Sequence, residues 1–182
     1  ALAVWLQCRA LGVPSEVIGA AFAGFRGVKR RQEPRGEVRG VLVIDDFAHH
    51  PTAVRETLRA LRARYPGRRL LAVFEPRSAT SRRKVFQADY AAAFDEAQQI
   101  YIAQPYDQSR IQSDDQFSSE QLIADLQRRG RDATLVPTTP DVSAAVAQVA
   151  ERAAAGDLIA VLSNGGFGGF IPRLLEQLDR AR

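Results

Sequence analysis

Short runs of consecutive apolar residues recur along the chain, and each is followed by a stretch with helical periodicity. Two of these runs, 70–74 and 158–162, are apolar at every position. A strand of this kind suits a parallel sheet that is covered on both faces, because both of its faces are then buried. Strands that alternate with helices over short connections predict a doubly wound α/β fold.

We expect a mostly parallel sheet of six strands with one antiparallel strand. The antiparallel strand ends near Val38, because Arg39-Gly40 before the next apolar run is typical of a tight hairpin. The other expected strands are 41–44, 70–74, 100–103, 134–136 and 158–162. The expected helices between and after them are 53–64, 82–97, 119–129, 141–155 (capped by Thr139, with Pro140 at its first position) and 171–178.

Residues 1–32 have a different pattern. Two short amphipathic stretches, 2–11 and 15–24, predict a helix pair, and an aperiodic linker follows. A pair of this size cannot bury its apolar faces alone. We therefore expect residues 1–32 to belong to a second domain and residues 33–182 to form the sheet domain. The chain begins with Ala1 and contains no methionine, so we expect a piece of a longer protein.

Composition narrows the class of protein. Hydrophobic residues make up 46% of the chain, and the single cysteine, Cys8, has no partner for an internal disulfide. The lone cysteine favours the cytoplasm. No apolar run is long enough for a membrane helix, so we expect no membrane partner. The first 69 residues carry 13 basic and 6 acidic side chains. No DNA-reading motif accompanies them, so a phosphate-bearing ligand is expected rather than nucleic acid.

The segments that follow the parallel strands hold the candidate functional residues, because ligands of such sheets bind at the carboxyl ends of the strands. The first segment is Asp45-Asp46-Phe47-Ala48-His49-His50-Pro51, which contains both histidines of the chain. Three interpretations stay open: a helix cap before Pro51, a metal site, or a contact with a nucleotide. The two neighbouring carboxylates point to opposite sides of a strand, which disfavours a shared metal.

Two later segments also carry ligand-binding chemistry. Glu75-Pro76-Arg77-Ser78 leads into Ala79-Thr80-Ser81-Arg82-Arg83, where hydroxyls and guanidinium groups suit an anion or a simple helix cap. Ser163-Asn164-Gly165-Gly166-Phe167-Gly168-Gly169 has four glycines within five positions, which allow the backbone to approach a ligand or form a flexible connection.

Together these segments resemble the Mur ligases of peptidoglycan synthesis. The resemblance rests on Lys29-Arg30-Arg31-Gln32-Glu33, the hairpin, the segment 45–52 and the two later segments, and it covers essentially the whole chain. It implies the Rossmann-like carboxy-terminal domain of the family over 33–182, and the end of the central ATPase domain over 1–32. Within the family, the segments 75–78 and 163–169 look like those of the muropeptide ligases.

The resemblance implies a reaction and a set of roles. ATP, with Mg²⁺, phosphorylates the carboxylate of UDP-N-acetylmuramate, and the amine of L-alanyl-γ-D-glutamyl-meso-diaminopimelate attacks the acyl phosphate in peptidoglycan recycling. The implied nucleotide-binding residues are Arg31, Asp46 and His49. The implied peptide-binding residues are Arg77, Ser78, Ser163, Asn164, Gly165 and Gly166. No metal ligand is assigned within this chain.

The chain lacks parts of the whole enzyme. It contains no G-x-x-G-K-[ST] phosphate loop, so we expect these 182 residues to have no ligase activity alone. Three alternatives stay open. They are a UDP-N-acetylmuramate–L-alanine ligase, a non-catalytic nucleotide- or peptide-binding module, and a metal-dependent hydrolase that uses the residues Asp45, Asp46, His49 and His50.

Overall fold

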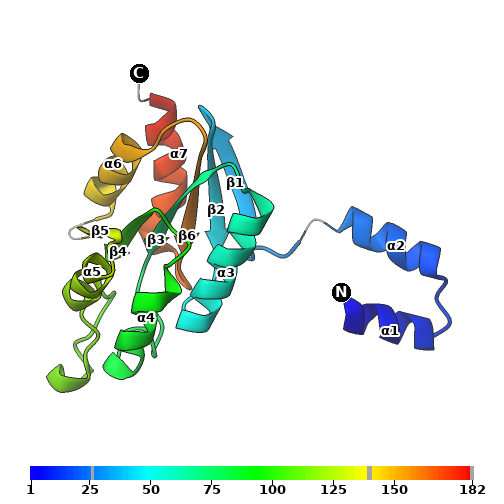
Figure 1. The fold of residues 1–182 in the computed structure, drawn as a ribbon, viewed down its shortest axis with the longest axis horizontal. Coiled ribbons are helices and arrows are strands. Elements are labelled where there is room, and N and C mark those ends of the chain that lie inside the picture. Colours follow the sequence, from blue (N-terminus) through cyan, green and yellow to red (C-terminus); the bar gives the residue numbers. More distant parts are fainter. Residues whose placement is uncertain (26, 139–140, 181–182) are drawn as a thin grey trace.

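One six-stranded sheet, in the order β1-β2-β6-β3-β4-β5, organises the molecule (Figure 1). The computed structural model describes residues 1–25, 27–138 and 141–180. The strands are β1 (Glu33–Val38), β2 (Val41–Asp46), β3 (Arg69–Phe74), β4 (Gln99–Ala103), β5 (Asp132–Val136) and β6 (Asp157–Leu162). Only β1 runs antiparallel to its neighbour, and all other pairings are parallel. The predicted fold class and strand count are confirmed.

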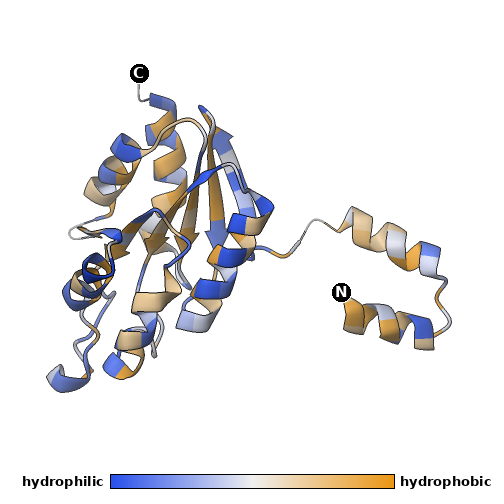
Figure 2. Ribbon diagram, in the orientation of Figure 1, coloured by the Kyte–Doolittle hydropathy of each residue, from blue (hydrophilic) through white to orange (hydrophobic). Residues whose placement is uncertain are grey.

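Helices cover both faces of this sheet. The helices α3 (Pro51–Arg64), α4 (Gln87–Ala93) and α5 (Ser119–Arg128) pack on one face, and α6 (Ser143–Arg152) and α7 (Phe170–Arg180) pack on the other. Alternate residues of β3 supply the two cores: Leu70, Ala72 and Phe74 face α3 and α4, whereas Leu71 and Val73 face α6 and α7. Figure 2 shows the apolar strands between helices whose outer faces are hydrophilic. No helix among the described residues is long and apolar enough to cross a membrane.

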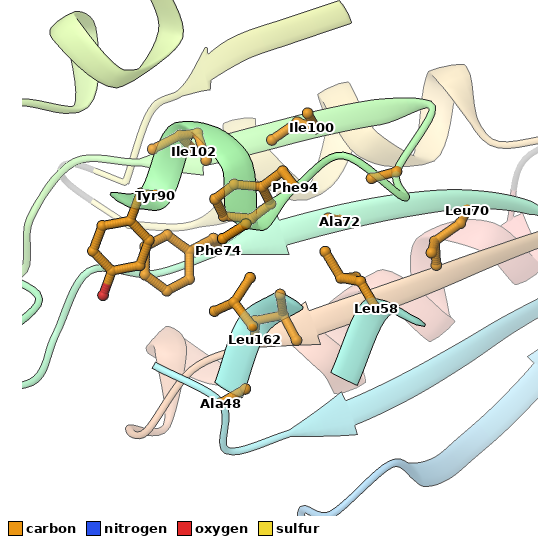
Figure 3. Packing of buried hydrophobic residues seen from close by; sticks show 14 of the residues in the cluster. Ala48, Leu58, Leu70, Ala72, Phe74, Tyr90, Phe94, Ile100, Ile102 and Leu162 are labelled. Carbon is orange, nitrogen blue, oxygen red and sulfur yellow. The ribbon is translucent and has the colours of Figure 1, made fainter. Parts of the chain in front are cut away.

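An aromatic cluster supports the segment that follows β2. Phe74 lies 5.2 Å from Tyr90 and 5.7 Å from Phe94, centroid to centroid, beneath the end of β3 (Figure 3). The Tyr90 hydroxyl donates a hydrogen bond to the carbonyl oxygen of His49. Burial raises the pKa of Tyr90, so the hydroxyl stays protonated and keeps this donor at neutral pH.

The helix predicted over 82–97 is shorter in the structure. A 3₁₀ turn over Lys84–Phe86 precedes α4, which ends at Ala93. The reason is a long-range contact: Arg83 forms an isolated antiparallel bridge with Gln116, which holds its backbone extended at ψ 153°. Of the helix predicted over 141–155, the structure forms Ser143–Arg152. Its predicted caps, Thr139 and Pro140, lie outside the described residues.

The amino-terminal helices α1 (Leu2–Ala10) and α2 (Ser15–Gly24) pack on each other and stand apart from the sheet (Figure 1). Ile18 is the buried residue of the pair, whereas large apolar side chains such as Leu2, Leu6 and Leu11 are exposed. Two further short 3₁₀ turns, Ser113–Asp115 and Phe167–Gly169, complete the described elements.

The β1–β2 hairpin depends on a glycine. Gly40 has φ +79°, and a Cβ atom there would lie 3.2 Å from the Cβ atom of Ala155. We expect Gly40→Ala to lower the free energy of unfolding by about 1–2 kcal/mol, because it adds left-handed strain and crowding. Gly67→Ala is the control, because its Cβ atom meets nothing within 4 Å. Urea unfolding that gave equal stabilities for the two variants would contradict this account.

Candidate functional site

The strand register brings the three polar segments to one edge of the sheet. Leu162 of β6 is aligned with Asp46 of β2 and with Phe74 of β3. The backbone continues this alignment by one residue, because Ser163 N donates to Asp46 O at 3.1 Å and Glu75 N donates to Leu162 O at 3.0 Å. The segments after β2, β3 and β6 therefore leave the sheet at the same level and side by side.

Asp46 fastens the linker to the end of β2. Its carboxylate is buried, with 4% of the residue exposed. It accepts hydrogen bonds from Gln32 N at 2.8 Å, Ala48 N at 2.7 Å and the Thr57 hydroxyl at 3.4 Å. A carboxylate offers about four acceptor sites, so one further donor can still reach Oδ2, which the Gln32 amide alone contacts.

A cavity of about 450 Å³ opens beside this carboxylate, and we call it the Asp46 cavity. Arg31 and His49 line it together with Asp46, so the structure brings together the three residues predicted to bind a nucleotide. The Arg31 guanidinium lies 4.9 Å from the ring centroid of Phe47, and His49 Nδ1 lies 3.0 Å from the Phe47 carbonyl oxygen. The cavity thus combines an exposed cation, two rings and a carboxylate.

The other members of this segment do not converge on a metal. Asp45 points to the opposite side of β2, where its carboxylate lies 3.5 Å from Arg30 Nε and 3.2 Å from Arg35 Nη1. His50 is the cap of α3, because its Nδ1 accepts from Thr52 N at 3.3 Å and Pro51 occupies the first helical position. No group of three His, Cys, Asp or Glu residues suited to a metal occurs in the described part of the chain.

Arg77 is held on several sides where β3 ends. Its guanidinium carbon lies 3.6 Å from the ring centroid of Tyr106, and Nη1 lies 3.4 Å from Glu75 Oε1. Glu75 is itself buried, with 5% exposed, and its other oxygen accepts from the Ser163 hydroxyl at 2.5 Å. The Arg77 side chain also lies against Gly165, where a Cβ atom would come within 2.1 Å of Arg77 Cδ.

Arg30 of the linker also fixes the glycine-rich segment 163–169. Arg30 Nη2 donates to the carbonyl oxygens of Ser163 at 2.5 Å and Gly165 at 2.7 Å. Gly165 N donates to the Ser163 hydroxyl at 2.9 Å, which closes a tight turn. Gly168 has φ +57°, and a Cβ atom there would lie 2.9 Å from Val142 Cγ1. The segment is therefore a packed turn rather than a flexible connection.

The residues predicted to bind a peptide separate into two cavities. Arg77 lines a cavity of about 400 Å³, the Arg77 cavity, with Glu75, Tyr106, Asp141 and Arg173. A second cavity of about 230 Å³, on the side of Arg30 and Asp45, is lined by three other members of the predicted set: Ser163, Gly165 and Gly166.

Two members of the predicted peptide set face the protein. Ser78 is 9% exposed, its hydroxyl donates to Ser81 Oγ at 2.8 Å, and it lines neither of these two cavities. The Asn164 side-chain oxygen is buried and has no hydrogen-bond partner among the described residues. The Ser78 hydroxyl therefore stabilises its own turn, and neither side chain lines these two cavities.

Three residues of this site were not singled out from the sequence. Glu75 begins the segment after the strand 70–74, and its position directly after an apolar strand could have identified it as a candidate. Arg30 is adjacent to the predicted Arg31, but its role depends on carbonyl groups of a turn more than 130 positions away. Tyr106 follows β4, and its stacking with Arg77 has no signature in the sequence.

The position of Arg77 depends on the absence of a side chain at Gly165. We expect Gly165→Ala to displace Arg77 from Tyr106, because the added methyl group overlaps Arg77 Cδ and Nε. The Nε–H NMR resonance of Arg77 should then lose the ring-current shift that Tyr106 causes. Gly166→Ala is the matched control in the same turn, because its Cβ atom meets nothing within 4 Å. An unshifted resonance in Gly165→Ala would disprove the packing described here.

The sequence of the chain matches one protein family and its curated members. Residues 30–165 match the family model described as "Mur ligase, glutamate ligase domain". The chain is 37% identical over 94% of its length to the Escherichia coli K12 protein named UDP-N-acetylmuramate–L-alanyl-γ-D-glutamyl-meso-2,6-diaminoheptandioate ligase. It is 32% identical over 91% of its length to UDP-N-acetylmuramate–L-alanine ligase of Desulfitobacterium hafniense Y51.

A solved structure of a ligase is also similar to this chain in fold and sequence. The murein peptide ligase of Psychrobacter arcticus 273-4 superposes with a TM-score of 0.72 at 32% identity, over 90% of this chain and 32% of that one. The chain spans 35% and 36% of the length of the Escherichia coli and Desulfitobacterium relatives. Because the family model covers all six strands, the two segments after β2 and β3, and the start of the segment after β6, the chain belongs to the Mur ligase family.

Proposed function

We propose that this chain is the carboxy-terminal domain of an ATP-dependent ligase that joins L-alanyl-γ-D-glutamyl-meso-diaminopimelate to UDP-N-acetylmuramate in the cytoplasm. Residues 1–32 are then the end of the central domain and its linker, and residues 33–182 are the domain that receives the peptide and part of the nucleotide. The name of the Escherichia coli relative supports this substrate pair.

The arrangement around Arg77 is the observation that carries the proposal. Its cavity has carboxylates and guanidinium groups, since the ion pair of Asp141 and Arg173 lines it together with Glu75 and Arg77. Hydrogen bonds from Ser143 lower the pKa of Asp141, so this carboxylate is ionised at neutral pH. A lining of both charges suits a substrate that carries ammonium and carboxylate groups together. A planar guanidinium held by stacking is oriented to bind a carboxylate through two hydrogen bonds.

The Asp46 cavity fits an adenine nucleotide. Arg31 offers its cation to phosphates, and Asp46 Oδ2 has an acceptor site left for a ribose hydroxyl. ATP would activate the carboxylate of UDP-N-acetylmuramate, and the residues of this chain would hold the nucleotide at its ribose and phosphates. Mg²⁺ would accompany the ATP phosphates, with its protein ligands mainly outside this domain.

A UDP-N-acetylmuramate–L-alanine ligase is the second candidate. The Desulfitobacterium relative has this name, and its identity of 32% is close to the 37% of the Escherichia coli relative. The two functions differ in the amine that is joined. Free alanine has one carboxylate and a short reach, whereas the tripeptide has several carboxylates along its length.

Arg77 is expected to decide the use of the peptide. In the complete ligase, Arg77→Ala should raise KM for the tripeptide about 10- to 100-fold, because a charged hydrogen bond is worth about 1.5–3 kcal/mol. KM for ATP should change less than about twofold. Arg128→Ala is the control, because Arg128 is 72% exposed and pairs only with Asp125. Wild-type preference for free L-alanine over the tripeptide would refute the proposed function and leave the family intact.

Asp46 is expected to affect the nucleotide instead. Asp46→Asn should raise KM for ATP about tenfold, since it weakens a charged hydrogen bond to the ribose, and it should leave KM for the tripeptide near its original value. Asp45→Asn is the neighbouring control, because that carboxylate faces Arg30 and Arg35 on the other side of β2. A rise confined to the tripeptide KM would show that the nucleotide does not bind here.

A further inference from the structure

Another cavity, distinct from those described above, adjoins the Arg77 cavity, and its walls are strongly basic. It measures about 520 Å³ and is lined by four arginines, Arg77, Arg82, Arg83 and Arg110, and by one acidic residue, Asp107. We call it the arginine cavity. It shares two residues with the Arg77 cavity, Arg77 and Tyr106, which are stacked on each other. The stacked pair is therefore a common wall between the two cavities.

The loop that carries Arg110 is anchored by side-chain amides. Gln108 Nε2 donates to the carbonyl oxygens of Arg82 at 2.8 Å and Phe117 at 2.9 Å. Gln116 Nε2 donates to the carbonyl oxygen of Ile111 at 2.9 Å, immediately after Arg110. These bonds fold the loop over the segment that follows Arg77. These hydrogen bonds therefore hold Arg110 in place at the wall of the cavity.

Carboxylates neutralise part of the positive charge in this cavity, because Arg77 pairs with Glu75. Asp107 also lies near two of the arginines: hydrogen bonds from Ser109 and the charges of Arg82 and Arg110 lower its pKa. Arg82 donates to the backbone carbonyl oxygens of Ser78 and Asp107 and has no carboxylate within ion-pair distance among the described residues. Arg83 pairs with the carboxylate of Asp115. No carboxylate of the described residues pairs with Arg110. Such a concentration of cations in a concave surface attracts anions.

We propose that the arginine cavity is a second anion subsite, which binds the side-chain carboxylate of the third residue of the peptide. The inference rests on the proposed function. A peptide whose nearer part occupies the Arg77 cavity would cross the Arg77–Tyr106 wall and place its far carboxylate among Arg82 and Arg110. A single amino acid would fill the first cavity only, and the arginine cavity therefore selects long acidic substrates.

The nucleotide is the other source of anionic groups, and the geometry disfavours it. The Asp46 cavity and the arginine cavity have no lining residue in common. The arginine cavity instead follows β3 and β4, whereas the Asp46 cavity follows β2. Because the arginine cavity shares Arg77 and Tyr106 with the Arg77 cavity, the carboxylates of a peptide seated there are the anions that this arrangement favours.

Two peptides that differ by one carboxylate test this subsite. Complete ligase would be assayed with L-alanyl-γ-D-glutamyl-meso-diaminopimelate and with the same tripeptide ending in L-lysine, which lacks the side-chain carboxylate. We expect the wild type to prefer the first peptide in kcat/KM. Arg110→Ala should reduce that preference about fivefold, the effect of removing a partly exposed charge pair. Arg110→Lys should restore part of it, and Arg128→Ala should leave it unchanged.

The outcomes separate the subsite from the proposed function. Use of the tripeptides with a preference that Arg110→Ala does not alter would overturn the subsite alone. A higher KM for ATP in Arg110→Ala, with unchanged peptide selection, would assign the cavity to the nucleotide and overturn it as well. Exclusive use of free L-alanine by the wild type would overturn the proposed function, and the subsite with it.

Discussion

The last strand of the chain, β6, lies between β2 and β3 and pairs in parallel with both. Polar contacts fix its register against β3 at each end: Arg69 donates two hydrogen bonds to Asp157 at one end, and Ser163 donates to Glu75 at the other. Buried carboxylates are costly when they lose partners, so a shifted register would remove hydrogen bonds from both acids. The three functional segments come together only when this strand is in place, which makes the site dependent on the most non-local pairing of the sheet.

Much of the fold could be predicted because it depends on local patterns. The apolar runs gave the strands, and Arg39-Gly40 gave the hairpin, whose two turn residues both have positive φ. The helix predicted from residue 82 failed for a non-local reason, since the bridge between Arg83 and Gln116 holds the chain extended. Ser118 combines a local and a non-local contact: its hydroxyl caps α5, and its amide donates to Gln87 of α4.

The candidate site could be predicted where its residues are close in sequence. Asp46 and His49 come from one segment, and the linker arginine, Arg31, joins them because Asp46 binds the linker backbone. The surroundings of Arg77 could not be predicted in this way. Tyr106 comes from the end of a different strand, and the anchoring of its loop depends on glutamine amides, which bind backbone carbonyl groups and have no characteristic spacing.

The glycine turn after β6 connects the linker with the peptide side of the sheet. Arg30 holds the carbonyl oxygens of Ser163 and Gly165 from the linker side, while Glu75 holds the Ser163 hydroxyl from the other. Arg77 in turn occupies the space that Gly165 leaves free. Because each contact uses a different atom of the same short turn, a displaced linker would remove the carbonyl contacts and release the surface against which Arg77 packs. The cavities on the two sides of β6 therefore share one support, the turn from Ser163 to Gly165.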